Sequence, residues 1–226
     1  MTMKATSDIE ALTRPFAGGP TRGKFLDWAI YRTHKLGQRI GWALGREKVR
    51  PHRQLLSSAV ERLRDSFGEL TCVETGCIRR ADEGTDSTLA IATALGESGG
   101  TLYTFELEAE HIAVCRSVCH QVNDRIRYVE GDSRTNLRKL RADGTLKVVH
   151  LAFFDSGDDA DLIWEEFRAI EDLFVPGSIV IVDDAIPPSV KGRRVKPYLH
   201  RRLDWDTRVT YTWHGMLVAQ KRTGGR

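Results

Sequence analysis

The sequence has no long hydrophobic run, and nowhere do apolar side chains continue for the roughly 18 positions that a membrane-spanning helix needs. Its start, MTMKATSDIE, lacks the ~7–15-residue apolar core of a secretory signal. There are only four cysteines, and without a signal we expect them to be reduced thiols and not a disulfide framework. These absences predict a cytoplasmic protein without a membrane span.

The composition supports one packed domain with an appended arm, because 226 residues with 41% hydrophobic and 29% charged side chains suffice for a single core. The net charge of +3 is unevenly spread. Residues 22–64 hold eleven Lys and Arg against three acids, a local charge of +8, while residues 155–184 hold ten acids against Arg168 alone. The basic stretch either attracts nucleic acid or forms a solvated helix face, and the sequence leaves both open.

The N-terminal region has its own pattern. Residues 1–22 are rich in Gly and Pro and are expected to be a mobile lead-in. Helical spacing of apolar residues follows over 25–45 and resumes after Pro51. We therefore divide the chain into a basic helical extension, 1–66, and a main domain, 67–226, and expect the extension to be a surface through which the chain could form a homo-oligomer.

From residue 70 onward, short apolar strands alternate with amphipathic helices. Strands are expected at 70–75, 101–106, 126–130, 147–154 and 178–183. Helices are expected at 86–97, 109–122, 134–141 and 160–174. This alternation predicts an α/β fold, a doubly wound and mainly parallel Rossmann-like sheet with helices on both faces. Residues 207–213 and 216–221, joined by His214 and Gly215, predict an antiparallel hairpin at its end.

In such a sheet a ligand binds at the carboxyl ends of the strands. Gly76 follows the first strand and would let a ligand approach the backbone, and Asp86 or Ser87 could cap the next helix. Glu106 ends the second strand, where an acid suits the hydroxyls of a ribose.

The third strand is followed by Asp132 and Ser133, which could meet an adenine edge. Each of these features alone is also typical of an ordinary turn or helix cap, but together they predict an adenosine pocket. A nicotinamide dinucleotide is disfavoured because the compact G-x-G-x-x-G turn is missing: after Gly76 the next glycine is Gly84.

Acidic residues follow the fourth and fifth strands. Asp155 ends one, and Asp183 and Asp184 end the other, and neighbouring strand ends lie about 5 Å apart. Converging carboxylates repel one another unless a cation compensates them, and oxygen ligands suit Mg²⁺. The sequence therefore predicts a magnesium site, with helix capping or pairing to basic side chains as the alternative.

The order of these motifs resembles the class I S-adenosylmethionine-dependent methyltransferases, in VETGC with STLAIA, in TFELE and in EGDS, over roughly residues 70–221. The VETG…STL form and the terminal GMLVAQK are most similar to the small-molecule, catechol-type O-methyltransferases. The resemblance implies that Glu74, Gly76 and Ser87 surround the methionine part of the cofactor, Glu106 the ribose, and Asp132 and Ser133 the adenine, with Asp155 also on the cofactor side. One departure is the expanded loop 78–85, where the family has a compact glycine-rich turn.

The same resemblance implies a role for the acids, because metal-dependent members hold their metal with an acid after the fourth strand and a pair after the fifth. Asp155, Asp183 and Asp184 stand at those positions. The catechol-type enzymes have a basic lysine three residues after the first metal acid, and here that position is Asp158. Asp158 or His214 could replace it as the catalytic base.

The sequence thus predicts a Mg²⁺-dependent O-methyltransferase that uses S-adenosylmethionine to methylate a hydroxyl of a small molecule. Two alternatives stay open. One is a nucleic-acid-associated methyltransferase that uses the basic arm, and the other is a protein that binds the cofactor without catalysis.

Overall fold

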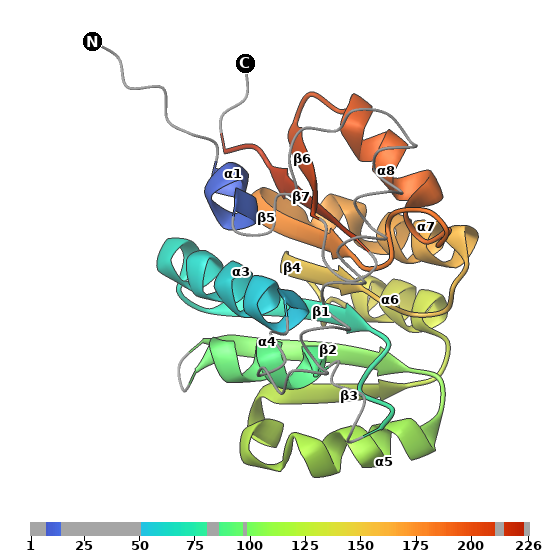
Figure 1. Ribbon diagram of the computed structural model, residues 1–226. Coiled ribbons are helices and arrows are strands. Elements are labelled where there is room, and N and C mark those ends of the chain that lie inside the picture. The colour runs from blue at the N-terminus through green and yellow to red at the C-terminus, as the bar shows by residue number, and fades with distance from the viewer. Residues whose placement is uncertain (1–7, 15–50, 81–85, 97–98, 211–214, 224–226) are drawn as a thin grey trace, which may run out of the picture.

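A computed structural model describes residues 8–14, 51–80, 86–96, 99–210 and 215–223 of the chain. Its centre is a seven-stranded sheet in the order β3-β2-β1-β4-β5-β7-β6. The strands are β1 (Leu70–Thr75), β2 (Gly100–Glu106), β3 (Ile126–Glu130), β4 (Val149–Phe154), β5 (Phe174–Val182), β6 (Trp205–Thr210) and β7 (Met216–Lys221). The first five are parallel, and β7 pairs antiparallel with both β5 and β6. The predicted doubly wound sheet with its C-terminal antiparallel hairpin is confirmed (Figure 1).

Helices cover both faces of the sheet (Figure 1). One apolar cluster joins the sheet to the helices α1 (Asp8–Thr13), α3 (Pro51–Phe67), α4 (Ser87–Leu95) and α5 (Ala109–Val118). A second joins it to the helices α6 (Ser133–Ala142), α7 (Ala160–Ile170) and α8 (Gly192–Arg201). Short 3-10 turns, His120–Arg125 and Glu171–Leu173, follow α5 and α7. Alternate side chains of each strand therefore enter different cores, as a parallel sheet covered on both faces requires.

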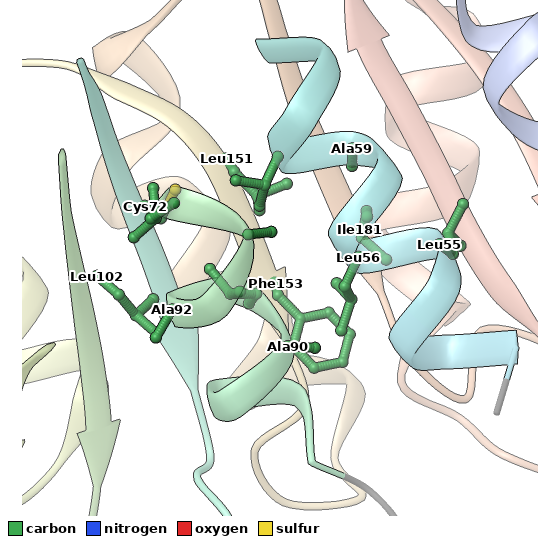
Figure 2. Packing of buried hydrophobic residues seen from close by; sticks show 14 of the residues in the cluster. Leu55, Leu56, Ala59, Cys72, Ala90, Ala92, Leu102, Leu151, Phe153 and Ile181 are labelled. Carbon is green, nitrogen blue, oxygen red and sulfur yellow. The ribbon is translucent and has the colours of Figure 1, made fainter. Parts of the chain in front are cut away.

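Helix α3 packs directly on the sheet although it lies in the predicted extension. Its Leu55, Leu56 and Ala59 are fully buried and belong to the same cluster as Phe153 of β4 and Ile181 of β5 (Figure 2). Burial of a large aliphatic side chain contributes about 1.5–3 kcal/mol. The described part of the extension thus adds substantially to the core, and the boundary at residue 66 stays a prediction.

Two helices differ from the sequence-based expectation. Residues 8–13 form α1 within the predicted mobile lead-in, because Ile9 and Leu12, three positions apart, are buried in the first cluster. Helix α8 was not predicted, because its many basic residues conceal the buried pair Val195 and Leu199 at helical spacing. The helix expected over 25–45 lies outside the described residues.

Strand β5 begins at Phe174, four residues before the predicted start. Its register with β4 shifts between Val149 and Leu151, opposite the segment that contains Pro176 and Gly177. Proline has no N–H for the ladder, which explains why the sequence pattern placed the strand after it. Among the described residues, no helix has both the length and the apolar character needed to cross a membrane.

Candidate active site

The strand order places the topological switch point of the sheet at the carboxyl ends of β1 and β4. From β1 the chain winds to β2 and β3 on one side and then continues with β4 and β5 on the other. Ligands of doubly wound sheets bind at this reversal. The described residues that the sequence assigned to a site lie near the carboxyl ends of β1 to β5 or in the segments that follow these strands.

Gly76 brings the ends of β1 and β4 into close contact. It has a φ of 85°, and a Cβ added to it would lie 2.5 Å from the carbonyl oxygen of Asp155. Its own N–H donates to the carbonyl of Phe105 at 2.8 Å. Only glycine fits this left-handed position without displacing the backbone of β4.

Glu74 lies beneath this loop, fully buried on the face covered by α4. Its Oε2 accepts hydrogen bonds from the hydroxyls of Thr88 at 2.7 Å and Thr104 at 2.8 Å. Burial raises the pKa of Glu74 to about 8. The carboxyl group therefore acts as a packed, hydrogen-bonded support under the start of α4.

The start of α4 is held by ion pairing and not by a side-chain cap. Ser87 is the first residue of the helix, and the preceding Asp86 makes no side-chain cap hydrogen bond. The side chain of Asp86 instead accepts a hydrogen bond from Arg53 of α3 at 3.0 Å. Thus Arg53, one of the basic residues of the N-terminal segment, pairs with an acid of the same chain and is not simply a solvated charge.

Glu106 ends β2 beside the β1 loop. Its Oε1 accepts the backbone N–H groups of Leu107 at 2.9 Å and Glu108 at 3.2 Å. Its Oε2 lies 3.4 Å from the N–H of Cys77, the residue after Gly76. Glu106, which is predicted to bind the ribose, thus lies next to the loop that is predicted to contact the methionine part of the cofactor. Backbone N–H groups fix the position of its carboxylate.

Asp132 and Ser133 begin α6. Asp132 accepts the N–H of Thr135 at 2.9 Å as a helix cap and forms an ion pair with Arg134 at 2.7 Å. Arg134 and this cap hold the pKa of Asp132 down, at about 2. Ser133 donates to Glu166 at 2.5 Å, so both side chains already have partners within the protein.

Glu166 of α7 is a site residue that sequence analysis missed. It is fully buried and also accepts a hydrogen bond from Thr75 of β1 at 3.0 Å. Burial raises its pKa. The carboxyl group connects the ends of β1 and β3 through Thr75 and Ser133. The sequence feature that could have revealed Glu166 is its place, as a charged residue, within the apolar stripe of a helix that also contains Ile163 and Phe167.

The predicted acidic residues converge. Asp155 follows β4, and Asp183 and Asp184 follow β5. One carboxylate oxygen from each lies within 4.8 Å of the other two. The prediction that these three side chains meet is confirmed.

The three acids have two basic partners that sequence analysis did not assign to the site. Lys191 Nζ lies 2.5 Å from Asp155 and 3.5 Å from Asp184, and its side chain is only 6% exposed. His52 Nε2, from α3, lies 3.1 Å from Asp183. We call these five residues the ionic cluster. The sequence did not single out Lys191 or His52, because each lies in a segment that contains many other basic residues.

The charges of the ionic cluster perturb one another. Burial and the nearby Asp183 raise the pKa of Asp155, although Lys191 opposes this. Burial alone would lower the pKa of Lys191, but the attraction of Asp155 and its neighbours outweighs it and raises the value. For His52 the same competition with burial also ends in a raised pKa, through its contact with Asp183.

A divalent cation matches the ionic cluster by ligand type but not by charge. Three carboxylates within 4.8 Å are hard oxygen ligands of the kind Mg²⁺ takes. The Lys191 ammonium, however, contacts two of these three carboxylates. A second cation in contact with the same oxygens would meet strong repulsion at this range. The described arrangement therefore does not fit Mg²⁺ while Lys191 keeps this position.

Of the two residues predicted as the catalytic base, the structure describes only Asp158. Asp158 is exposed and accepts a hydrogen bond from Ser189 at 3.0 Å. His214 lies outside the described residues. Both roles stay predictions.

A family of methyltransferase domains matches residues 53–185, more than half of the chain, from the first turn of α3 to just past the end of β5. The chain belongs to this methyltransferase family. The resemblance to class I S-adenosylmethionine-dependent methyltransferases is thereby confirmed.

Solved structures share the fold of this methyltransferase. The O-methyltransferase TomG from Streptomyces achromogenes, involved in tomaymycin synthesis and solved with SAM, is 20% identical, with a TM-score of 0.62 over 83% of this chain and 88% of that one. Cofactor-bound Rv0187 from MTB is 18% identical, with a TM-score of 0.60 over 96% and 97%. A putative caffeoyl-CoA O-methyltransferase from Staphylococcus aureus is 12% identical, with a TM-score of 0.57 over 88% and 100%. No curated protein sequence matches the chain.

Proposed function

We propose that this methyltransferase transfers the methyl group of S-adenosylmethionine to a hydroxyl group of a small molecule. The observation that carries the proposal is the contact between Gly76 and Asp155, because it joins the predicted cofactor loop to the ionic cluster. A methyl group presented above β1 would meet an acceptor held above β4 and β5. Two of the fold relatives are described as O-methyltransferases, which agrees with this reaction class.

In this proposal the loops of the first three strands bind the cofactor. The backbone at Gly76 and the start of α4 at Ser87 lie against the methionine part, over the buried Glu74. Glu106 receives the ribose hydroxyls. Asp132 and Ser133 border the adenine, and Asp155 lies between the cofactor and the acceptor.

The chemical step breaks the bond between sulfur and the methyl carbon and forms a bond between that carbon and the acceptor oxygen. The sulfonium becomes a neutral thioether, and the hydroxyl proton passes to a base, for which Asp158 and His214 are the candidates. Because a cation and an oxyanion give neutral products, alignment and exclusion of water supply much of the acceleration. The protein's task is to hold the acceptor oxygen in line with the methyl group.

The test is methyl transfer from labelled S-adenosylmethionine to a panel of phenols, catechols and sugar alcohols, each paired with an analogue in which the hydroxyl is already methylated. We expect label in the hydroxyl compounds and none in their blocked partners. Label in RNA or DNA instead would favour the nucleic-acid alternative. Cofactor binding in calorimetry without transfer to any compound or nucleic acid would favour a non-catalytic binding protein.

The magnesium dependence predicted from the sequence rests on Asp155, Asp183 and Asp184, and the contacts of Lys191 with two of these carboxylates weigh against it. The same assay, run with a chelator and with added Mg²⁺, tests it. Full activity in chelator would leave a metal-independent methyltransferase.

A further inference from the structure

The ionic cluster contains its own cation. The ammonium of Lys191 contacts Asp155 at 2.5 Å and reaches Asp184 at 3.5 Å, while His52 contacts Asp183 at 3.1 Å. Each of the three carboxylates that could have ligated a metal therefore has a basic partner from the chain. We infer that Lys191 occupies the place of the divalent cation, so that this methyltransferase works without a bound metal.

The backbone holds Lys191 at this place. Lys191 immediately precedes α8, and its N–H lies 3.4 Å from the hydroxyl of Ser189. The next residue, Gly192, is pressed against the turn after β5, because a Cβ on it would lie 2.6 Å from the carbonyl oxygen of Ala185. The start of α8 is therefore fixed beside the carboxyl ends of β4 and β5, which the three acids follow.

Displacing the ammonium would be unfavourable. The Lys191 residue is 5% exposed, so its side chain lies inside the protein and is not a surface lysine that reaches in. A buried ammonium without its carboxylate partners loses solvation and gains nothing in return. An incoming metal ion must either move this group or share oxygens with it, and both choices weaken metal binding.

The ammonium also supplies what the proposed reaction needs. Lysine has three N–H donors and no acceptor. The hydrogen bond to Asp155 uses one of these donors and Asp184 lies within ion-pair distance, so a donor is left for an acceptor oxygen, whose developing negative charge the ammonium stabilises. This last role rests on the proposed function, whereas the occupation of the metal place by Lys191 does not.

The test measures Mn²⁺ binding to the full-length protein by electron paramagnetic resonance, without cofactor or acceptor. Wild type should bind no Mn²⁺ at micromolar concentrations. Lys191→Ala removes the ammonium from Asp155 and Asp184 and should increase Mn²⁺ affinity at least about 100-fold, on the scale of Coulomb energies between charges in contact near a protein surface. A further change, Asp155→Asn, in that variant should remove the gain.

Two control variants accompany these measurements. Lys196→Ala removes a lysine of the same helix outside the ionic cluster and should behave as wild type. Lys191→Arg keeps the positive charge and should remain free of metal. Circular dichroism verifies that each variant is folded.

Saturable Mn²⁺ binding by wild type at micromolar concentration would overturn the inference, even if no variant folds. So would a folded Lys191→Ala variant without any gain in affinity. In the methyl-transfer assay, wild type should keep its activity in chelator, and Lys191→Ala should lose it there and regain part with Mg²⁺. If neither wild type nor any variant methylates a hydroxyl, but the Mn²⁺ affinities are as expected, the proposed function is wrong. The inference that Lys191 occupies the place of the divalent cation is then still supported.

Discussion

Glu74 should make this protein less stable as the pH rises from mildly acidic to mildly basic. Its ordinary pKa is 4.5, and burial raises the value in the folded protein to about 8. Between these values the unfolded chain binds fewer protons than the folded one, so the free energy of unfolding falls with increasing pH. The gap corresponds to about 5 kcal/mol at about 1.4 kcal/mol per pH unit, and relaxation around the carboxylate will reduce it.

Glu74→Gln removes the ionisation and keeps the shape. Its amide would still meet the hydroxyls of Thr88 and Thr104. We expect wild type and variant to have similar stability near pH 5, and the variant to be more stable by several kcal/mol at pH 8. Urea unfolding followed by circular dichroism, without cofactor, at pH 5, 6, 7 and 8 measures the difference.

The matched control is Glu69→Gln, because Glu69 directly precedes the same strand and is exposed. Its pH profile should follow that of wild type. Other buried carboxyl groups such as Glu166 contribute to the wild-type slope, so the decisive quantity is the difference between Glu74→Gln and wild type at each pH. A difference that does not change between pH 5 and pH 8 would refute the account of Glu74 as a buried group that is neutral in the folded protein.

Three further outcomes follow from the site and the core. Glu106→Ala should weaken S-adenosylmethionine binding by about 1.5–3 kcal/mol in calorimetry, and an unchanged dissociation constant in a folded variant would remove Glu106 from the ribose role. Gly76→Ala should destabilise the protein clearly more than Gly68→Ala in urea unfolding, because both positions have positive φ but only Gly76 has the β4 backbone in the way of a Cβ; equal losses would contradict this. Leu55→Ala should reduce the free energy of unfolding by about 2–5 kcal/mol, against almost no change for the exposed Gln54→Ala, and a small loss would mean that α3 is not part of the core.

Much of the fold followed from the sequence because its signals are local and repeated. The strands Leu70–Thr75 and Ile126–Glu130 have the predicted bounds, and each is a short strand-like run with a glycine directly after it. The antiparallel end followed from the Gly215 turn between two strand-like runs. The helices α1 and α8 did not follow, because a helix of six residues gives little periodicity and a highly charged helix hides the few apolar residues that it buries.

For the candidate site, the sequence determined which residues stand at the ends of the strands. In a parallel sheet these ends share one edge, so Gly76, Glu106, Asp155 and Asp183 could be grouped without coordinates. Glu166 belongs to this set only through its buried hydrogen bonds to Thr75 and Ser133, which depend on how α7 packs against the sheet.

Only the tertiary structure decided what neutralises the acids. The sequence predicted that Asp155, Asp183 and Asp184 converge and that something positive compensates them, with magnesium or basic side chains as the choices. Lys191 and His52 are separated from one another by most of the chain, and each was one of many basic residues in its segment. Their contacts with the acids arise because α3 and the start of α8 both pack beside the ends of β4 and β5, and such long-range packing leaves no periodic trace in the sequence.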